Sequence, residues 1–140
     1  MPDHEETVVV HASSERVLQV LTEVGRWPEW TPSMSRVELL GSGPLQVGSR
    51  VRIKQPRLPS VVWQVSDLGS DGFSWTNSAA GVASFADHRL SEDADGIRVR
   101  LLLRQHGPLA LLLGALTAGL TRRYLRMEAD GLKRRSEGTD

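Results

Sequence analysis

The feature that most constrains this fold is a long helical pattern in the last third of the chain, residues 108–134. Its front, residues 109–120, is almost entirely apolar, and its back is rich in charge. The helix follows a succession of short strand patterns, and strands segregated from helices indicate an α+β fold with an antiparallel sheet. At 1.5 Å per residue such a helix would extend roughly 40 Å, enough to cross a curved sheet.

The apolar front of this helix is too short to cross a membrane. Arg122 and Arg123 interrupt it after about a dozen residues, whereas a spanning helix needs about 20. We therefore expect a buried helix face and no membrane span. The first residues, MPDHEETVVV, lack the basic segment and long apolar core of a signal peptide, which predicts a cytoplasmic protein.

Seven strand patterns precede this helix, separated by turns rich in glycine and proline. They cover residues 7–11, 36–40, 50–54, 61–68, 73–77, 81–90 and 97–106. After the first of them, Ser13 or Ser14 can cap a short helix that ends at Gly25. The pattern predicts one domain, residues 1–140, with a short polar tail, residues 136–140, that frays.

The composition excludes several classes of function. Seventeen basic and seventeen acidic residues give a net charge of zero, which argues against nucleic-acid binding. The chain has no cysteine, so disulfides, cysteine zinc sites and thiol nucleophiles are excluded. No motif indicates a metal or a cofactor, and we expect neither. Net neutrality is compatible with a monomer or a homodimer.

Several short motifs, in a fixed order, resemble those of a known superfamily. They are Trp27-Pro28-Glu29-Trp30, Trp63-Gln64-Val65, His88-Arg89-Leu90 with Gly96-Ile97-Arg98-Val99, and Gly107-Pro108-Leu109 with Leu132-Lys133-Arg134. Their order over nearly the whole chain resembles the helix-grip (SRPBCC) superfamily, which includes START domains, Bet v 1-like pollen allergens and bacterial polyketide cyclases/dehydrases. The resemblance implies a seven-stranded sheet wrapped around the last helix, with a deep apolar cavity between them.

Tryptophans are the first candidates for the wall of such a cavity. The chain has four of them beside only two phenylalanines and one tyrosine. Trp63 and Trp75 fall on strand faces that we expect to point inward, and Trp30 falls at the expected cavity mouth. A tryptophan offers a large apolar face and one N–H, which suits a flat ligand. Simple core packing is the alternative for all three.

His88 is the candidate catalytic residue. By the two-residue period of a strand it shares a face with Ser84 and Ala86, whose small side chains leave space for a ligand. Imidazole is the natural proton shuttle near neutral pH. The alternatives are a histidine bonded to a neighbouring strand, or one turned outward by a shift of register by one residue.

Further polar and apolar side chains complete the predicted ligand-binding set. The polar members are Asn77, Gln105 and Tyr124, each able to hold a carbonyl or a hydroxyl. The apolar floor is predicted from the spacing of one helix face, namely Leu109, Leu113, Leu116 and Leu120.

The expected function is the binding of a hydrophobic small molecule, either a lipid or an aromatic, polyketide-like compound. An enzyme is the alternative, a polyketide cyclase or dehydrase in which His88 moves a proton α to a carbonyl while Asn77 or Gln105 holds the enolate. A third hypothesis is a protein-interaction domain whose cavity is filled by side chains. The sequence leaves these three open.

Overall fold

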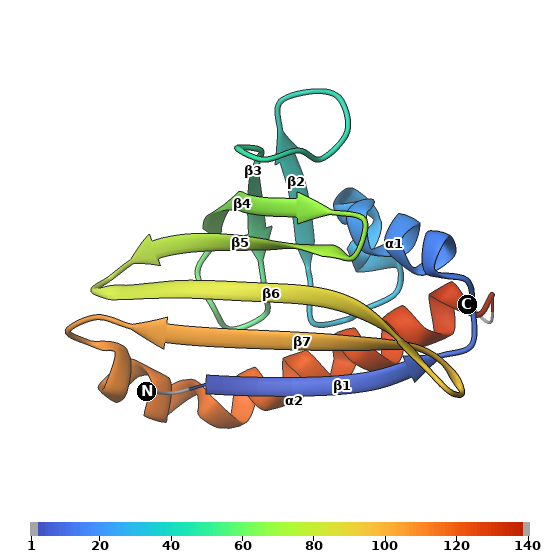
Figure 1. The fold of residues 1–140 in the computed structure, drawn as a ribbon. Helices are drawn as coiled ribbons and strands as arrows, with labels where there is room; N and C mark the ends of the chain where they lie inside the picture. Colours follow the sequence, from blue (N-terminus) through green and yellow to red (C-terminus); the bar gives the residue numbers. More distant parts are fainter. Residues whose placement is uncertain (1–2, 139–140) are drawn as a thin grey trace.

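Seven strands pair into one antiparallel sheet in the computed structural model, which describes residues 3–138 (Figure 1). In chain order the elements are β1 (Asp3–Val10), α1 (Ser14–Thr22), the 3-10 helix η1 (Val24–Glu29), β2 (Arg36–Leu40), β3 (Arg50–Lys54), β4 (Val61–Gly69), β5 (Gly72–Ala79), β6 (Val82–Asp93), β7 (Gly96–His106) and α2 (Ala110–Ser136). The strands precede one long helix, so the α+β class predicted from the sequence is confirmed.

The sheet is an open meander that includes one long-range strand pairing. The strand order is β1-β7-β6-β5-β4-β3-β2, so β1 pairs with the last strand of the chain and all other pairs are between chain neighbours. In Figure 1, β2 and β3 stand steeply across the direction of β4 to β7, which shows how strongly the sheet bends. The register of β4 shifts between Val65 and Asp67, and irregularities of this kind bend and twist a strand.

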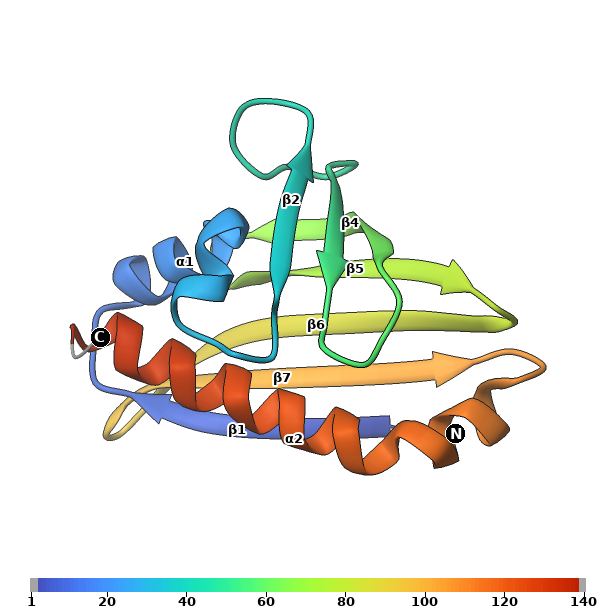
Figure 2. The ribbon, with the colours of Figure 1, turned by 180° about the vertical axis from the view of Figure 1, so that it is seen from behind.

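Helix α2 lies against one face of this sheet, as Figure 2 shows from the opposite side of the molecule. It packs against β1, β7 and α1. Together α1 and η1 lie at the end of the sheet where α2 finishes (Figure 2). Within residues 3–138, no helix has an apolar segment long enough to cross a bilayer.

Local patterns located most elements correctly, and β2 and β3 have the predicted bounds. Strand β1 begins earlier than predicted, because its ladder with β7 extends over charged residues and pairs Asp3 with Arg104. Helix α1 has Ser13 as its N-cap and ends at Thr22 rather than at Gly25. The α-helix ends there because the chain continues as the more tightly wound 3-10 helix η1.

The ends of α2 also differ from the prediction. The helix begins at Ala110 rather than at Pro108, which belongs to the preceding turn. Ser136, expected to start a frayed tail, is only 4% exposed. The Glu137 carboxylate accepts a hydrogen bond from the His11 N–H at 2.7 Å, so the chain is held in place at least to this residue. Residues 139–140 of the expected tail lie outside the described residues.

Helix α2 passes very close to the end of η1 at Gly131. A Cβ atom added there would lie 2.1 Å from the Trp30 carbonyl oxygen and 2.9 Å from Trp30 Cε3. Backbone cannot yield as a flexible side chain can, so only a residue without a Cβ permits this approach.

We expect Gly131→Ala to lower the free energy of unfolding by about 1–3 kcal/mol, the usual magnitude of overpacking. Gly119→Ala on the same helix is the matched control, because no atom lies within 4 Å of a Cβ added there. The control should be stabilised by up to about 1 kcal/mol through helix propensity. Urea unfolding of both variants measures the difference. Equal effects would contradict the close packing at Gly131.

Candidate functional site

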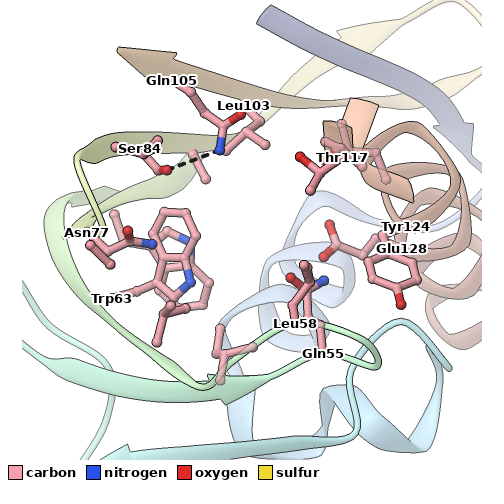
Figure 3. A pocket seen from close by; sticks show the side chains of 18 of the residues that line it. Gln55, Leu58, Trp63, Asn77, Ser84, Leu103, Gln105, Thr117, Tyr124 and Glu128 are labelled. Atoms are coloured by element: carbon pink, nitrogen blue, oxygen red, sulfur yellow. Dashed lines mark hydrogen bonds between the residues drawn. The ribbon is translucent and has the colours of Figure 1, made fainter. Parts of the chain in front are cut away.

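A cavity of about 260 Å³ lies between the inner face of the sheet and α2 (Figure 3). Strands β4 to β7 form one wall and α2 forms the other. The loop between β3 and β4 contributes Gln55, Leu58 and Pro59. The Tyr124 hydroxyl of α2 donates a hydrogen bond to the Pro56 carbonyl, which ties this loop to the helix. Three distant parts of the chain therefore enclose the cavity.

The sheet wall is built from cross-strand rows that run from β5 through β6 to β7. The rows are Phe73–His88–Leu101, Trp75–Ala86–Leu103 and Asn77–Ser84–Gln105. Side chains of alternate residues on a strand share a face, and Ser84, Ala86 and His88 all line the cavity. The register of β6 is therefore the one in which His88 points inward.

Aromatic rings cluster around Phe73, Trp75 and His88 of the first two rows. The ring centroids of Trp27 and Trp75 are 5.4 Å apart, and those of Trp27 and His88 are 5.6 Å apart. Trp63 extends the group along the wall, 5.8 Å from Trp75. The Trp27 indole N–H donates to the Leu21 carbonyl at 3.1 Å, which leaves its apolar surface for packing. This aromatic cluster gives one side of the cavity an apolar lining of rings that are tilted to one another.

The His88 ring is 4% exposed and stacks on Phe73 with a centroid separation of 4.3 Å. Its Nδ1 lies 3.2 Å from the Phe73 carbonyl oxygen. Because a carbonyl only accepts, Nδ1 carries the proton, and Nε2 of the neutral ring is left as an acceptor. Burial lowers the pKa of His88 to about 4, against the opposing effect of the Phe73 hydrogen bond. At neutral pH this ring is uncharged and only weakly basic.

The last row supplies polar groups to the wall. The Gln105 Nε2 donates to the Ser84 hydroxyl at 3.4 Å. Its other amide atom, Oε1, is buried and has no hydrogen-bond partner among residues 3–138. Asn77 lines the cavity beside them and offers one donor group and one acceptor. Gln105 Oε1 is therefore an unsatisfied acceptor enclosed within the wall and not open to the cavity.

The helix wall differs from the predicted apolar floor. The residues of α2 that line the cavity are Leu113, Thr117, Thr121, Tyr124, Leu125 and Glu128. Of the predicted leucines, the structure brings only Leu113 to the cavity. Leu116 is 73% exposed and Leu109 is 42% exposed, and Leu120 is half-buried away from the lining. The front of α2 is apolar on every side, so hydrophobic spacing there could not identify the inward face.

Glu128 is the main residue that the sequence interpretation missed. It is 8% exposed, and Figure 3 shows its carboxyl group directed from α2 into the space facing the sheet. Among residues 3–138, no side chain or backbone group makes a hydrogen bond or ion pair with this carboxyl. Burial raises its pKa to about 8, so it is mostly protonated at pH 7. The signal in the sequence was its position four residues after Tyr124, on the same helix face.

Trp30 does not lie at the mouth of the cavity as predicted. It is 6% exposed and packs on Trp27, with ring centroids 5.7 Å apart. It borders a separate polar cleft, and Trp27 lines the cavity instead. The two prolines, Pro28 and Pro32, predicted a short turn or a single helical loop here, and η1 is such a turn, which brings Trp27 and Trp30 into the core. Of the predicted set, the structure brings together Trp63, Trp75, Asn77, His88, Gln105, Leu113 and Tyr124.

The cavity lining contains the carboxyl groups of Asp87 and Glu128 but no strongly basic side chain among residues 3–138. Within the part of the chain that the structure describes, no lysine or arginine lines the cavity. Asp87 borders it, but the Asp87 carboxylate accepts a hydrogen bond from Arg89 at 2.8 Å. No group of three or more His, Asp or Glu side chains among residues 3–138 is arranged to hold a metal ion.

Comparison with known families finds one family whose model matches nearly the whole chain. The model of the family described as "Polyketide cyclase / dehydrase and lipid transport" matches residues 1–137. The chain belongs to this family. A search among curated proteins found no match by sequence. The superfamily suggested by the tryptophan and histidine motifs is therefore confirmed.

Solved structures show the same fold at low sequence identity. A START superfamily protein from Mycobacterium smegmatis has a TM-score of 0.77 at 16% identity, over 99% of both chains. Ara h 8.0201 has a TM-score of 0.73 at 10% identity, over 97% of both chains. The di-domain ARO/CYC StfQ from the steffimycin biosynthetic pathway has a TM-score of 0.73 at 15% identity, over 99% of this chain and 50% of its own. The predicted helix-grip, Bet v 1-like fold is thus confirmed for this member of the polyketide cyclase/dehydrase and lipid transport family.

Proposed function

We propose that this protein binds a small hydrophobic molecule, with a flat aromatic body, in the cavity between the sheet and α2. The observation that carries the proposal is an open cavity of about 260 Å³ with Trp63 and Trp75 on one wall. Ligand pockets of drug-sized compounds measure roughly 300–1,000 Å³, so the volume favours a compact ligand over a long lipid chain. A cavity filled by side chains, as an interaction domain would have, is not what this volume supports.

Binding is favoured over cyclase or dehydrase chemistry by the properties of His88. A general base works best with a pKa near the operating pH, and burial lowers the pKa of His88 to about 4. Its free Nε2 is better suited to accept a hydrogen bond from a bound hydroxyl than to remove a proton from carbon. We therefore assign His88 a role in ligand binding.

A thermal-shift and fluorescence titration tests this proposal. A neutral aromatic probe, 2-(naphthalen-1-yl)ethanol, should raise the melting temperature and quench tryptophan fluorescence, because it would lie against Trp63 and Trp75. At about 100 times its Kd a ligand adds roughly 2.7 kcal/mol of stability.

Two variants of adjacent residues on α2 locate the binding site. Thr117→Trp fills the cavity, which Thr117 lines, and should abolish both signals. Leu116→Trp is the matched control on the outer face, where the native side chain is 73% exposed, and it should bind like the wild type. Signals that persist in Thr117→Trp would mean that the probe binds elsewhere.

A further inference from the structure

The Glu128 carboxyl is a polar group whose partner is missing from the described chain. Buried polar groups in native proteins nearly always have hydrogen-bond partners. Glu128 is 8% exposed, is aimed into the cavity, and has no hydrogen bond or ion pair among residues 3–138. The remaining place for a partner is the cavity itself, so its contents must supply one.

The His88 ring points to the same kind of partner. Nε2 of this cavity-lining ring is an acceptor because Nδ1 donates to the Phe73 carbonyl. An unsatisfied acceptor requires a ligand that donates hydrogen bonds. A poly-carbonyl compound brings only acceptors and would leave Nε2 of His88 without a donor.

The charge of the cavity also discriminates between ligands. A fatty-acid carboxylate would be desolvated without a counterion, since no lysine or arginine among the described residues lines the cavity. An ammonium group would meet a carboxyl group on α2 and aromatic faces on the sheet. Tryptophan faces attract cations through the ring quadrupole.

We propose that the cavity is a site for hydrophobic amines, in which the ligand's ammonium group pairs with Glu128 and its aromatic body lies against Trp63 and Trp75. This inference rests on the proposed function, since it names the class of ligand for the same cavity. In the bound state Glu128 is ionised, and its proton has passed to solvent when the amine enters already protonated. The buried ion pair replaces a buried, unpartnered acid.

Four probes with the same naphthalene body test the headgroup. They are 2-(naphthalen-1-yl)ethylamine, 2-(naphthalen-1-yl)ethanol, 1-(naphthalen-1-yl)propan-2-one and 3-(naphthalen-1-yl)propanoate. At pH 7 the amine should bind at least tenfold more tightly than the alcohol, and the carboxylate should bind most weakly. A ketone that binds as tightly as the amine would overturn the proposal, because Glu128 would then act as a neutral donor.

Two variants connect this preference to Glu128. Glu128→Gln should reduce the ratio of amine to alcohol affinity to near one. Glu92→Gln, on an exposed part of β6 outside the cavity lining, should leave the ratio unchanged. A ratio that survives in Glu128→Gln overturns the assignment of this carboxyl.

Proton release is an independent readout. With a pKa of about 8, Glu128 is about nine-tenths protonated at pH 7, so binding of the ammonium form should release close to one proton. Calorimetry in two buffers of different ionisation enthalpy measures this number. The other titratable groups that line the cavity are neutral His88, Tyr124, which donates to Pro56, and Asp87, which is paired with Arg89.

The outcomes separate this inference from the proposed function. If the alcohol binds and the amine binds no better, the amine site is wrong and the aromatic pocket stands. If none of the four probes binds, both the pocket and the amine site are wrong. If the amine binds best without proton release, the ion pair with Glu128 is wrong.

Discussion

Replacing Glu128 by glutamine is expected to raise the free energy of unfolding of the unliganded protein by about 3 kcal/mol at pH 7. Burial raises the pKa of Glu128 from 4.5 to about 8. At pH 7 the unfolded chain therefore ionises a carboxyl that the folded protein keeps protonated. One pKa unit corresponds to about 1.4 kcal/mol, and about two and a half units of the difference lie below pH 7. Glutamine has nearly the shape of the protonated acid and carries no such cost.

The raised pKa of Glu128 also makes the free energy of unfolding depend on pH. The stabilising contribution of Glu128 to this free energy is fully present below pH 4.5 and is lost as the pH rises through about 8. The advantage of the glutamine variant should therefore grow by about 1.4 kcal/mol per pH unit between pH 5 and pH 8. Urea unfolding at several pH values measures it, with Glu92→Gln as the exposed control. If the variant and wild-type profiles run parallel, Glu128 is not a buried neutral acid.

His88 acts in the opposite direction in the wild type. Its pKa is lowered from 6.5 to about 4, so its contribution is present above pH 6.5 and is lost as the pH falls towards 4. Between pH 4.5 and pH 6.5 the free energy of unfolding should change little, because the decrease with pH caused by Glu128 and the increase caused by His88 nearly cancel. Above pH 6.5 only the decrease caused by Glu128 remains, so the free energy of unfolding should fall. Because His88 is present in both proteins, it drops out of the comparison with the Glu128 variant.

The second large effect is expected for Trp27→Ala, which should lower the free energy of unfolding by about 3–5 kcal/mol, the usual cost of truncating a buried tryptophan. Trp27 is 1% exposed and lies within 6.4 Å, between ring centroids, of Trp30, Phe73, Trp75 and His88. Its loss opens a void where η1, the sheet and the cavity meet. Denaturant unfolding followed by circular dichroism measures the change.

Trp63→Ala is the matched control for this prediction. Trp63 is half-buried and already borders open space in the cavity, so its truncation removes less packing and should cost clearly less than Trp27→Ala. Similar losses for the two variants would mean that Trp27 is not the centre of the aromatic cluster. Trp63→Ala should also weaken the binding of naphthalene probes, because it removes part of the cavity wall.

Sequence patterns predicted the strands well and the helix face poorly, and the difference has a physical cause. A strand such as β3 alternates Val51 and Ile53 with exposed cations, so its inner face is visible in a few residues. Helix α2 is apolar all round at its front. The inward face there includes Thr117 and Thr121 and excludes Leu116, which is the reverse of what hydrophobicity indicates.

The cavity could be predicted in part for the same reason. Period-two alternation correctly grouped Ser84, Ala86 and His88 on one face of β6, since that rule depends only on the local backbone. Trp27 lines the cavity in place of Trp30 because of how η1 packs against the sheet, which is a long-range contact that local sequence does not show. Glu128 was missed because charged residues are normally exposed.

By itself, the sequence determined the order of elements, the α+β class, the family and the inward face of the central strands, because these follow from local periodicity, turn residues and short motifs. Tertiary structure alone decided how α2 is rotated about its axis. That rotation is set by long-range packing, such as the contact of Gly131 with the Trp30 backbone. Since adjacent helix residues point about 100° apart, this one angle turned Leu116 outward and carried Glu128 into the cavity.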